Sequence, residues 1–149
     1  MTEKLLIQFS EGNSGWLKVQ IHSNETIVTF TASYVPYDSI YELTKGLSTF
    51  LSVGSNQRVS WNTEPIEYDF LFSKSGDKIR FEIVEYADNR RLTGTGKTVF
   101  NITGTVDSIV VPIWRALRNL EYSDYFEQEW KHKFPHQEMK FLTDLIKRR

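Results

Sequence analysis

Hydrophobic and polar residues alternate along three short runs in the first quarter of the chain. The runs span residues 5–9, 17–21 and 28–34, and turn-forming residues separate them at 12–15 and 23–25. A period of two places successive side chains on opposite faces of a β-strand, so one face can pack on a core. Asn, Gly and Ser between the runs favour tight turns. The opening therefore predicts a three-stranded antiparallel meander.

The spacing of hydrophobic residues changes to three and four after the third run. The residues that follow this spacing are Ile40, Leu43, Leu47, Phe50 and Leu51. Such a stripe is typical of an amphipathic α-helix. Asp38 suits the N-cap of this helix, and Gly54 suits its C-terminal end. We therefore expect a helix between these residues whose apolar face docks on the sheet.

Strand-like alternation then resumes before the chain becomes helical. The later runs cover residues 59–61, 66–72, 79–83 and 98–102. A hairpin loop is expected at 73–77, and a longer polar loop at 88–96. Helical spacing returns at 106–120, where Pro112 should kink the helix or mark its first turn. Asp124–Lys133 predicts a short aromatic helix, and Pro135 suits the first position of a final helix.

These elements predict an α+β fold. We expect a largely antiparallel sheet of about six to seven strands, one helix after the first three-stranded meander, and a helical C-terminal third. The 149 residues are the size of one ordinary domain, so residues 1–149 are assigned to a single α+β domain.

Composition and charge narrow the class of protein. The absence of cysteine excludes a disulfide framework and cysteine-ligated zinc. Residues 1–9 lack the apolar run of a signal peptide, and no stretch approaches the roughly 20 apolar residues of a membrane span. We therefore expect a cytoplasmic protein without a membrane partner. With 18 basic and 19 acidic residues, the chain lacks the basic excess of nucleic-acid binders.

Three patterns resemble catalytic or metal sites and are better explained by structure. Gly94-Thr95-Gly96-Lys97-Thr98 resembles the end of a phosphate-binding loop, but Arg91 stands where the first glycine is required and a strand should follow. Glu129 and His132 have the spacing of a helical metal pair, but the chain has three histidines. Carboxylates at Glu64, Glu67 and Asp69 have spacings that are common by chance. We therefore expect no catalytic residue, metal or cofactor.

Two segments are candidates for binding another protein. The first is the turn that contains Trp61 and Glu64, where an aromatic ring and a carboxylate lie close in sequence; a core Trp61 with a local N–H acceptor is the structural alternative. The second combines aromatic rings with unneutralised acids, namely Glu121, Tyr122, Asp124, Tyr125 and Glu129. Aromatic residues are enriched in interface hot spots. A packed helix with a solvated face is the alternative for this second segment.

The layout of the chain resembles the WapI-like immunity proteins that bacteria encode beside polymorphic toxins. The resemblance includes the strands around Trp61-Asn62-Thr63-Glu64-Pro65 and a helical tail that carries Tyr125-Phe126, Trp130, Phe134-Pro135, Glu138 and Leu142. It implies a protein that binds and blocks a cognate toxin without catalysis or cofactor. The net charge of −1 departs from the strongly acidic balance that would suit blocking a basic nuclease.

We therefore expect a non-catalytic, cytosolic protein-binding domain, with a toxin-blocking immunity protein as one form of it. A small-molecule binder, or an undetected enzyme with an aromatic-lined pocket, is the main alternative. Nucleic-acid binding through the basic end, Lys147-Arg148-Arg149, is a weaker alternative. The oligomeric state does not follow from the sequence.

Overall fold

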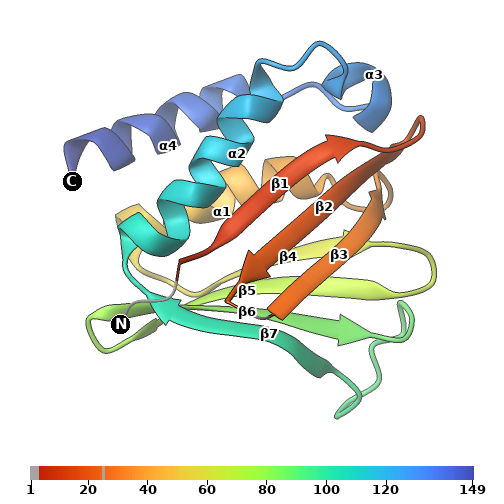
Figure 1. The fold of residues 1–149 in the computed structure, drawn as a ribbon, viewed down its shortest axis with the longest axis horizontal. Coiled ribbons are helices and arrows are strands. Elements are labelled where there is room, and N and C mark those ends of the chain that lie inside the picture. Colours follow the sequence, from red (N-terminus) through yellow and green to blue (C-terminus); the bar gives the residue numbers. More distant parts are fainter. Residues whose placement is uncertain (1–3, 25) are drawn as a thin grey trace.

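A computed structural model describes residues 4–24 and 26–149 of the chain. Within these residues it contains seven strands in one antiparallel sheet, together with four α-helices (Figure 1). The strands lie in the sheet in the order in which they occur along the chain. The α+β fold, the antiparallel sheet and the helical C-terminal region are therefore confirmed. Residue 25, in the second predicted turn, and residues 1–3 lie outside the described residues.

The elements agree closely with the predicted runs. The strands are β1 (Leu6–Glu11), β2 (Trp16–Ser23), β3 (Thr26–Ser33), β4 (Gln57–Asn62), β5 (Glu67–Ser75), β6 (Lys78–Tyr86) and β7 (Lys97–Gly104). The α-helices are α1 (Ser39–Val53), α2 (Val111–Glu121), α3 (Phe126–Trp130) and α4 (His136–Arg148). A π-helical turn, η1 (Val106–Val110), precedes α2.

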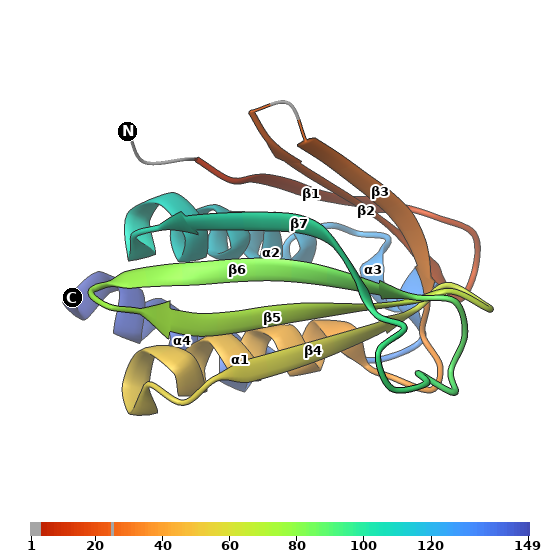
Figure 2. The ribbon, with the colours of Figure 1, turned by 90° about the horizontal axis from the view of Figure 1, so that it is seen from below.

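The sheet separates into two parts between β3 and β4 (Figure 2). Within the described strands, β3 pairs with β4 through one residue pair, Ser33 with Asn62. The strands diverge beyond this pair, and aromatic side chains fill the space between them. Phe30 of β3 stacks on Tyr68 of β5 with ring centroids 4.5 Å apart, and Trp61 lies 5.6 Å from Phe30. The core therefore extends through the junction between the two parts.

Helices α1, α2 and α4 cover one face of the sheet (Figures 1 and 2). Helix α1 packs on β4, α2 packs on β1, and α4 packs on α1. The N-cap of α1 is Asp38, whose carboxylate accepts from the Tyr41 N–H, and Gly54 ends the helix at a φ of 84°. Both predicted ends of this helix are therefore confirmed. None of the helices within the described residues has the length and hydrophobicity that a bilayer crossing requires.

The C-terminal elements and one hairpin differ from the expected boundaries. The stripe at 106–120 is two elements, because the π-helical turn ends at Val110 and Pro112 lies in the first turn of α2, where its missing N–H is not needed. Helix α3 is shorter than expected and covers Phe126–Trp130. The hairpin loop at 73–77 shrinks to Gly76 and Asp77, because β5 and β6 continue to the turn.

Tyr68 joins the aromatic junction to a carboxylate on the next strand. Its hydroxyl donates to Glu85 Oε2 at 2.9 Å. Burial and the hydrogen bond to Glu85 raise the pKa of Tyr68 to about 12. The folded protein therefore keeps this proton at pH values where the unfolded chain loses it.

We expect a pH-dependent loss of stability that belongs to Tyr68. The stability that the protonated Tyr68 hydroxyl contributes is fully present below the ordinary tyrosine pKa of about 10. It is lost as pH rises towards 12, because the unfolded state then binds fewer protons than the folded state. Urea unfolding between pH 9 and 11.5 should show a steeper decline for the wild type than for Tyr68→Phe, by at most about 1.4 kcal/mol per pH unit. If the free energy of unfolding falls equally with pH in the wild type and in Tyr68→Phe, Tyr68 is not the source of the loss.

Candidate functional site

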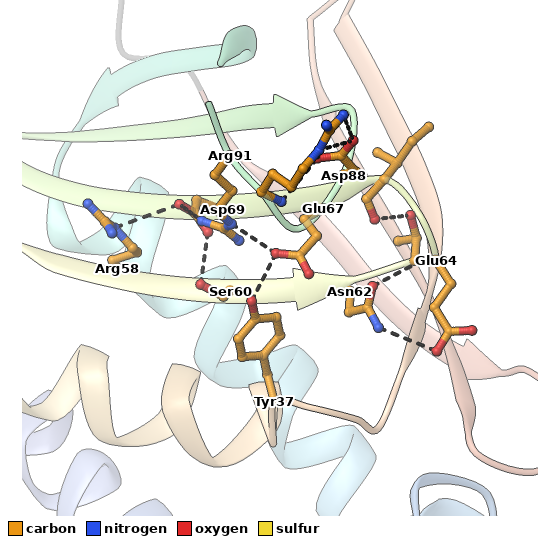
Figure 3. A network of polar contacts seen from close by, with 12 residues as sticks. Tyr37, Arg58, Ser60, Asn62, Glu64, Glu67, Asp69, Asp88 and Arg91 are labelled. Carbon is orange, nitrogen blue, oxygen red and sulfur yellow. Dashed lines mark hydrogen bonds and ion pairs between the residues drawn. The ribbon is translucent and has the colours of Figure 1, made fainter. Parts of the chain in front are cut away.

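Two carboxylates are buried on the sheet face that lies opposite the helices. Tyr68 and Phe70 of β5 point into the core, so the alternate residues Glu67 and Asp69 point away from it. The side chains of both acids are nevertheless 2% exposed. The connection between β6 and β7, residues 87–96, carries Arg91 onto them (Figure 3). A face that would otherwise meet solvent therefore contains buried charge.

Arg91 is the centre of this polar network, which we call the Arg91 cluster and which comprises Arg91, Glu67, Asp69 and Ser60. Arg91 Nε donates to Glu67 Oε1 at 2.8 Å, and Nη1 donates to Asp69 Oδ2 at 2.6 Å. The hydroxyl of Ser60 donates to Asp69 Oδ1 at 2.9 Å. Burial by itself lowers the pKa of Arg91, but the bonds to Asp69 and Glu67 outweigh it and raise that pKa. The guanidinium therefore stays charged between two carboxylates.

The glycines of the 87–96 connection allow it to lie close to the sheet. A Cβ on Gly96 would lie 2.8 Å from Tyr86 Cε1 and 2.9 Å from Val84 Cγ1, so any side chain there would force these two neighbours to move. Gly94 has a φ of 78°, in the left-handed region that favours glycine. Strand β7 follows directly, whereas a phosphate-binding loop is followed by a helix. The Gly94–Thr98 string therefore runs from the end of a glycine-rich connection into the first residues of β7.

A groove lies beside the Arg91 cluster, where three connections of the chain meet. Its volume is about 690 Å³, and it is open to solvent. It is lined by residues of the β3–α1 connection, the end of β4, the β4–β5 turn, the start of β5 and the β6–β7 connection. These residues are Pro36, Tyr37, Asn62, Glu64, Pro65, Glu67, Asp88 and Asn89. We call this hollow the Glu67 groove.

Glu67 forms the buried wall of the groove. The Tyr37 hydroxyl donates to Glu67 Oε1 at 2.9 Å, and Arg91 binds the same oxygen (Figure 3). Burial, together with the hydrogen bond to Glu67, raises the pKa of Tyr37, so its hydroxyl is a donor at neutral pH. Oε1 is thus occupied from two sides.

Glu64 is held in an unusual backbone conformation at the rim of the groove. Its φ is 49°, a left-handed value that is uncommon for a residue other than glycine. Asn62 supports it, because Asn62 Oδ1 accepts from the Glu64 N–H at 3.1 Å and Asn62 Nδ2 donates to Val35 O at 2.8 Å. Arg91, with a φ of 47°, is a second such residue beside the groove. Strained positions of this kind cluster at functional sites.

The charges around the groove do not cancel. Asp88 pairs with Arg90 at 2.8 Å, and Asp69 has a second guanidinium, that of Arg58, at 3.7 Å. The charged residues that line the groove are all carboxylates, namely Glu64, Glu67 and Asp88, of which Glu67 pairs with Arg91 and Asp88 with Arg90. Among the described residues, Glu64 has no ion pair. The groove therefore favours a cationic ligand.

The structure separates the two residues of the first predicted binding segment. Glu64 lines the groove, whereas Trp61 is fully buried in the aromatic core. Trp61 therefore cannot contact a partner in this structure, and the expectation of a shared Trp61–Glu64 surface is wrong for Trp61. The structural alternative is confirmed in placing Trp61 in the core, but its local acceptor is not found, because the indole N–H has no partner among the described residues.

The second predicted segment is divided between surface and core. Tyr122 is 73% exposed and Asp124 is also exposed, whereas Tyr125 and Glu129 are half-buried. Glu121 Oε2 lies 2.6 Å from His136 Nδ1, so this acid joins α2 to the start of α4. Burial raises the pKa of Tyr125, and nearby Glu11 adds to the effect.

The same segment supports one wall of the groove from behind. Trp130 Nε1 donates to Asp38 Oδ1 at 3.0 Å, and His132 Nε2 lies 3.0 Å from Tyr34 O. Both contacts attach the α3 region to the connection that carries Pro36 and Tyr37. His132 is therefore engaged with the β3–α1 connection, and residues 4–24 and 26–149 contain no group of three potential metal ligands.

Sequence reasoning missed Tyr37, Asn62, Asp88 and Arg91 as site residues. The sequence offers Glu64 and Glu67, or Asp69, as paired carboxylates, but spacings of this kind are common by chance. The available sequence signal for the site was the presence of two acids at alternate positions of an aromatic strand. Their burial depends on Arg91, which lies 24 and 22 residues further along the chain.

The fold and the site define an α+β protein with a seven-stranded meander sheet, helices on one face and an acidic groove beside a buried arginine. The chain matches no protein-family model, no curated protein and no solved structure.

Proposed function

We propose that this protein is a non-catalytic binding domain that holds a basic segment of another protein in the Glu67 groove. The observation that carries the proposal is the charge of this open groove, whose charged lining residues are all carboxylates, with Glu67 buried to 2% exposure. A buried charge is costly unless it is paired and hydrogen-bonded. Arg91 and Tyr37 already offset that cost at Oε1. The charge that supports a cationic ligand is the carboxylate of Glu64, which lines the same groove without an ion pair among the described residues.

The shape of the groove favours a protein partner over a small molecule. The groove is open and its lining is about as polar as it is apolar, whereas sites for small molecules are enclosed and mostly apolar. The large aromatic rings that would line an apolar pocket, such as Trp61, Phe70 and Phe81, are packed in the core. This supports the binding-domain interpretation over the small-molecule or enzyme alternative.

Binding of this kind would act by covering the basic segment of the partner. Complementary charge accelerates encounter and selects against acidic partners. An immunity protein that blocks a cognate toxin in the cytosol works in this way, and we propose this biological setting for the groove. The exposed Tyr122 and Asp124 would form a second contact area if the partner extends to α3.

The proposal is tested by co-purification with the product of a neighbouring toxin gene, followed by calorimetry on the purified pair. Glu64→Lys should weaken the complex at least about 10-fold, because it places a like charge against the partner. Asp77→Lys is the matched control, since Asp77 is exposed in the β5–β6 turn at the other end of β5. It should leave affinity within about two-fold.

Unchanged affinity after Glu64→Lys would contradict the groove as the binding site. Tyr122→Ala provides a second comparison. If it weakens the complex while Glu64→Lys does not, the docking surface lies on the α2–α3 connection instead.

A further inference from the structure

The two oxygens of Glu67 have different surroundings. Oε1 accepts from Tyr37 and from Arg91, whereas Oε2 has no hydrogen-bond partner among the described residues (Figure 3). The side chain is 2% exposed, and the residue lines the groove. Oε2 is not one of the fully enclosed side-chain atoms that lack a partner, so it is reachable from the groove. Oε2 is therefore an open acceptor position in the groove wall.

We infer that the Glu67 groove binds an arginine side chain of its partner and prefers it to lysine. The inference rests on the proposed function and specifies the group that is recognised. One added guanidinium would pair with Glu64, the groove carboxylate that has no ion pair among the described residues. It would also supply the donor that Oε2 lacks.

The chemistry of the groove distinguishes a guanidinium from an ammonium. A guanidinium offers five donors in one plane and can reach several acceptors at once, while an ammonium is a compact point charge. Glu67 Oε2 and the Glu64 carboxylate are acceptors at different places around a wide hollow. The guanidinium is also the more weakly hydrated cation, which suits contact with a carboxylate that is nearly excluded from water. Tyr37, Pro36 and Pro65 provide apolar surface for its flat faces.

The protein already binds one guanidinium on the same carboxylate. Arg91 reaches Glu67 Oε1 at 2.8 Å while its guanidinium carbon lies 4.8 Å from the centre of the Tyr86 ring. This arrangement combines a charged hydrogen bond with an aromatic face. A partner arginine on Oε2 would repeat the arrangement on the other oxygen, with Tyr37 as the neighbouring ring.

The test uses the full chain and three short peptides, each acetylated and amidated at its ends. The peptides are Gly-Arg-Gly, Gly-Lys-Gly and Gly-citrulline-Gly, in which citrulline is the neutral analogue of arginine. Titration is followed through the backbone amide signals in ¹H–¹⁵N NMR spectra. We expect the arginine peptide to shift the signals of Asn62, Glu64, Glu67 and Asn89, with an affinity about 10-fold above that of the lysine peptide and no binding of the citrulline peptide.

Two variants test whether the preference for arginine over lysine comes from the groove carboxylates. Glu67→Gln should remove the preference for arginine over lysine. Because Glu67 also anchors Arg91, Glu64→Gln is the second variant: Glu64 is exposed and without an ion pair among the described residues. It should weaken the arginine peptide about two- to five-fold while the protein stays folded.

The outcomes separate this inference from the proposed function. Equal affinity for the arginine and lysine peptides, no binding of either, or shifts outside the groove would overturn the arginine assignment. None of these results bears on the partner experiment, in which unchanged binding after Glu64→Lys is the result that contradicts the proposed function.

Discussion

Replacing Arg91 with alanine is expected to lower the free energy of unfolding by about 3–5 kcal/mol, the usual cost of leaving a buried charge without its partner. The substitution removes both hydrogen bonds that Arg91 donates, one to Glu67 and one to Asp69. Both carboxylates are 2% exposed, so without the guanidinium they would remain nearly buried with like charges close together. A loss of this size is a large part of the roughly 5–15 kcal/mol that stabilises an ordinary domain.

Urea unfolding at neutral pH measures this loss, with Arg90→Ala as the matched control. Arg90 is the preceding residue and pairs with Asp88, but its side chain is 70% exposed. Its removal should change the free energy of unfolding little, because exposed ion pairs contribute little to stability. If Arg91→Ala proves as mild as Arg90→Ala, Arg91 does not balance buried charge in the way described here.

A companion variant separates charge balance from packing. Arg91→Met combined with Glu67→Gln and Asp69→Asn removes all three charges while keeping side chains of similar volume. It should recover part of the stability that Arg91→Ala loses, because replacing a whole buried ionic group is often close to neutral. Recovery would show that the cost of Arg91→Ala comes from the unpaired carboxylates.

Leu47→Asp is expected to abolish cooperative unfolding. Leu47 is fully buried on the face of α1 that packs on the sheet, and α1 also contacts α4. The substitution loses the burial of a leucine, about 1.5–3 kcal/mol, and places an unpaired carboxylate in the core at several kcal/mol more. Together these costs approach the whole stability of a domain of this kind.

Thermal unfolding followed by circular dichroism checks this expectation, and Val53→Asp is the control. Val53 is an apolar residue of the same helix, but it is 73% exposed at the C-terminal end. An aspartate there meets only the unfavourable end of the helix dipole, so the cost should stay near or below about 1 kcal/mol. A Leu47→Asp protein that melts like the wild type would show that α1 does not dock through this stripe.

Local periodicity accounts for the parts of the fold that were predicted. The alternation in β2, β5 and β6 and the stripe of α1 follow from the direction in which each residue points, which neighbours in sequence determine. The caps of α1 were predictable for the same reason, since Asp38 and Gly54 act on the backbone within one turn. The π-helical turn before α2 has a comparable hydrophobic stripe, so spacing did not distinguish it from an α-helix.

The candidate site was only partly predictable, because its residues are brought together across the chain. Glu64 was chosen from its turn, and it does line the groove. Trp61 was chosen for the same surface, but the divergence of the sheet at the Ser33–Asn62 pair gives this ring a place in the core beside Phe30. The residues near Trp61 carry no pattern that predicts its packing against Phe30, on a strand about thirty residues earlier.

The amino-acid sequence by itself determined the strands, the main helix with its caps and the α+β class, because these depend on the alternation of polar and apolar side chains over a few residues. Only the tertiary structure decided that Glu67 and Asp69, at outward positions of β5, are buried beneath Arg91 and border a groove. The physical reason is that the free energy of a charged side chain depends on the groups that surround it in space, and here those groups come from connections far apart along the chain.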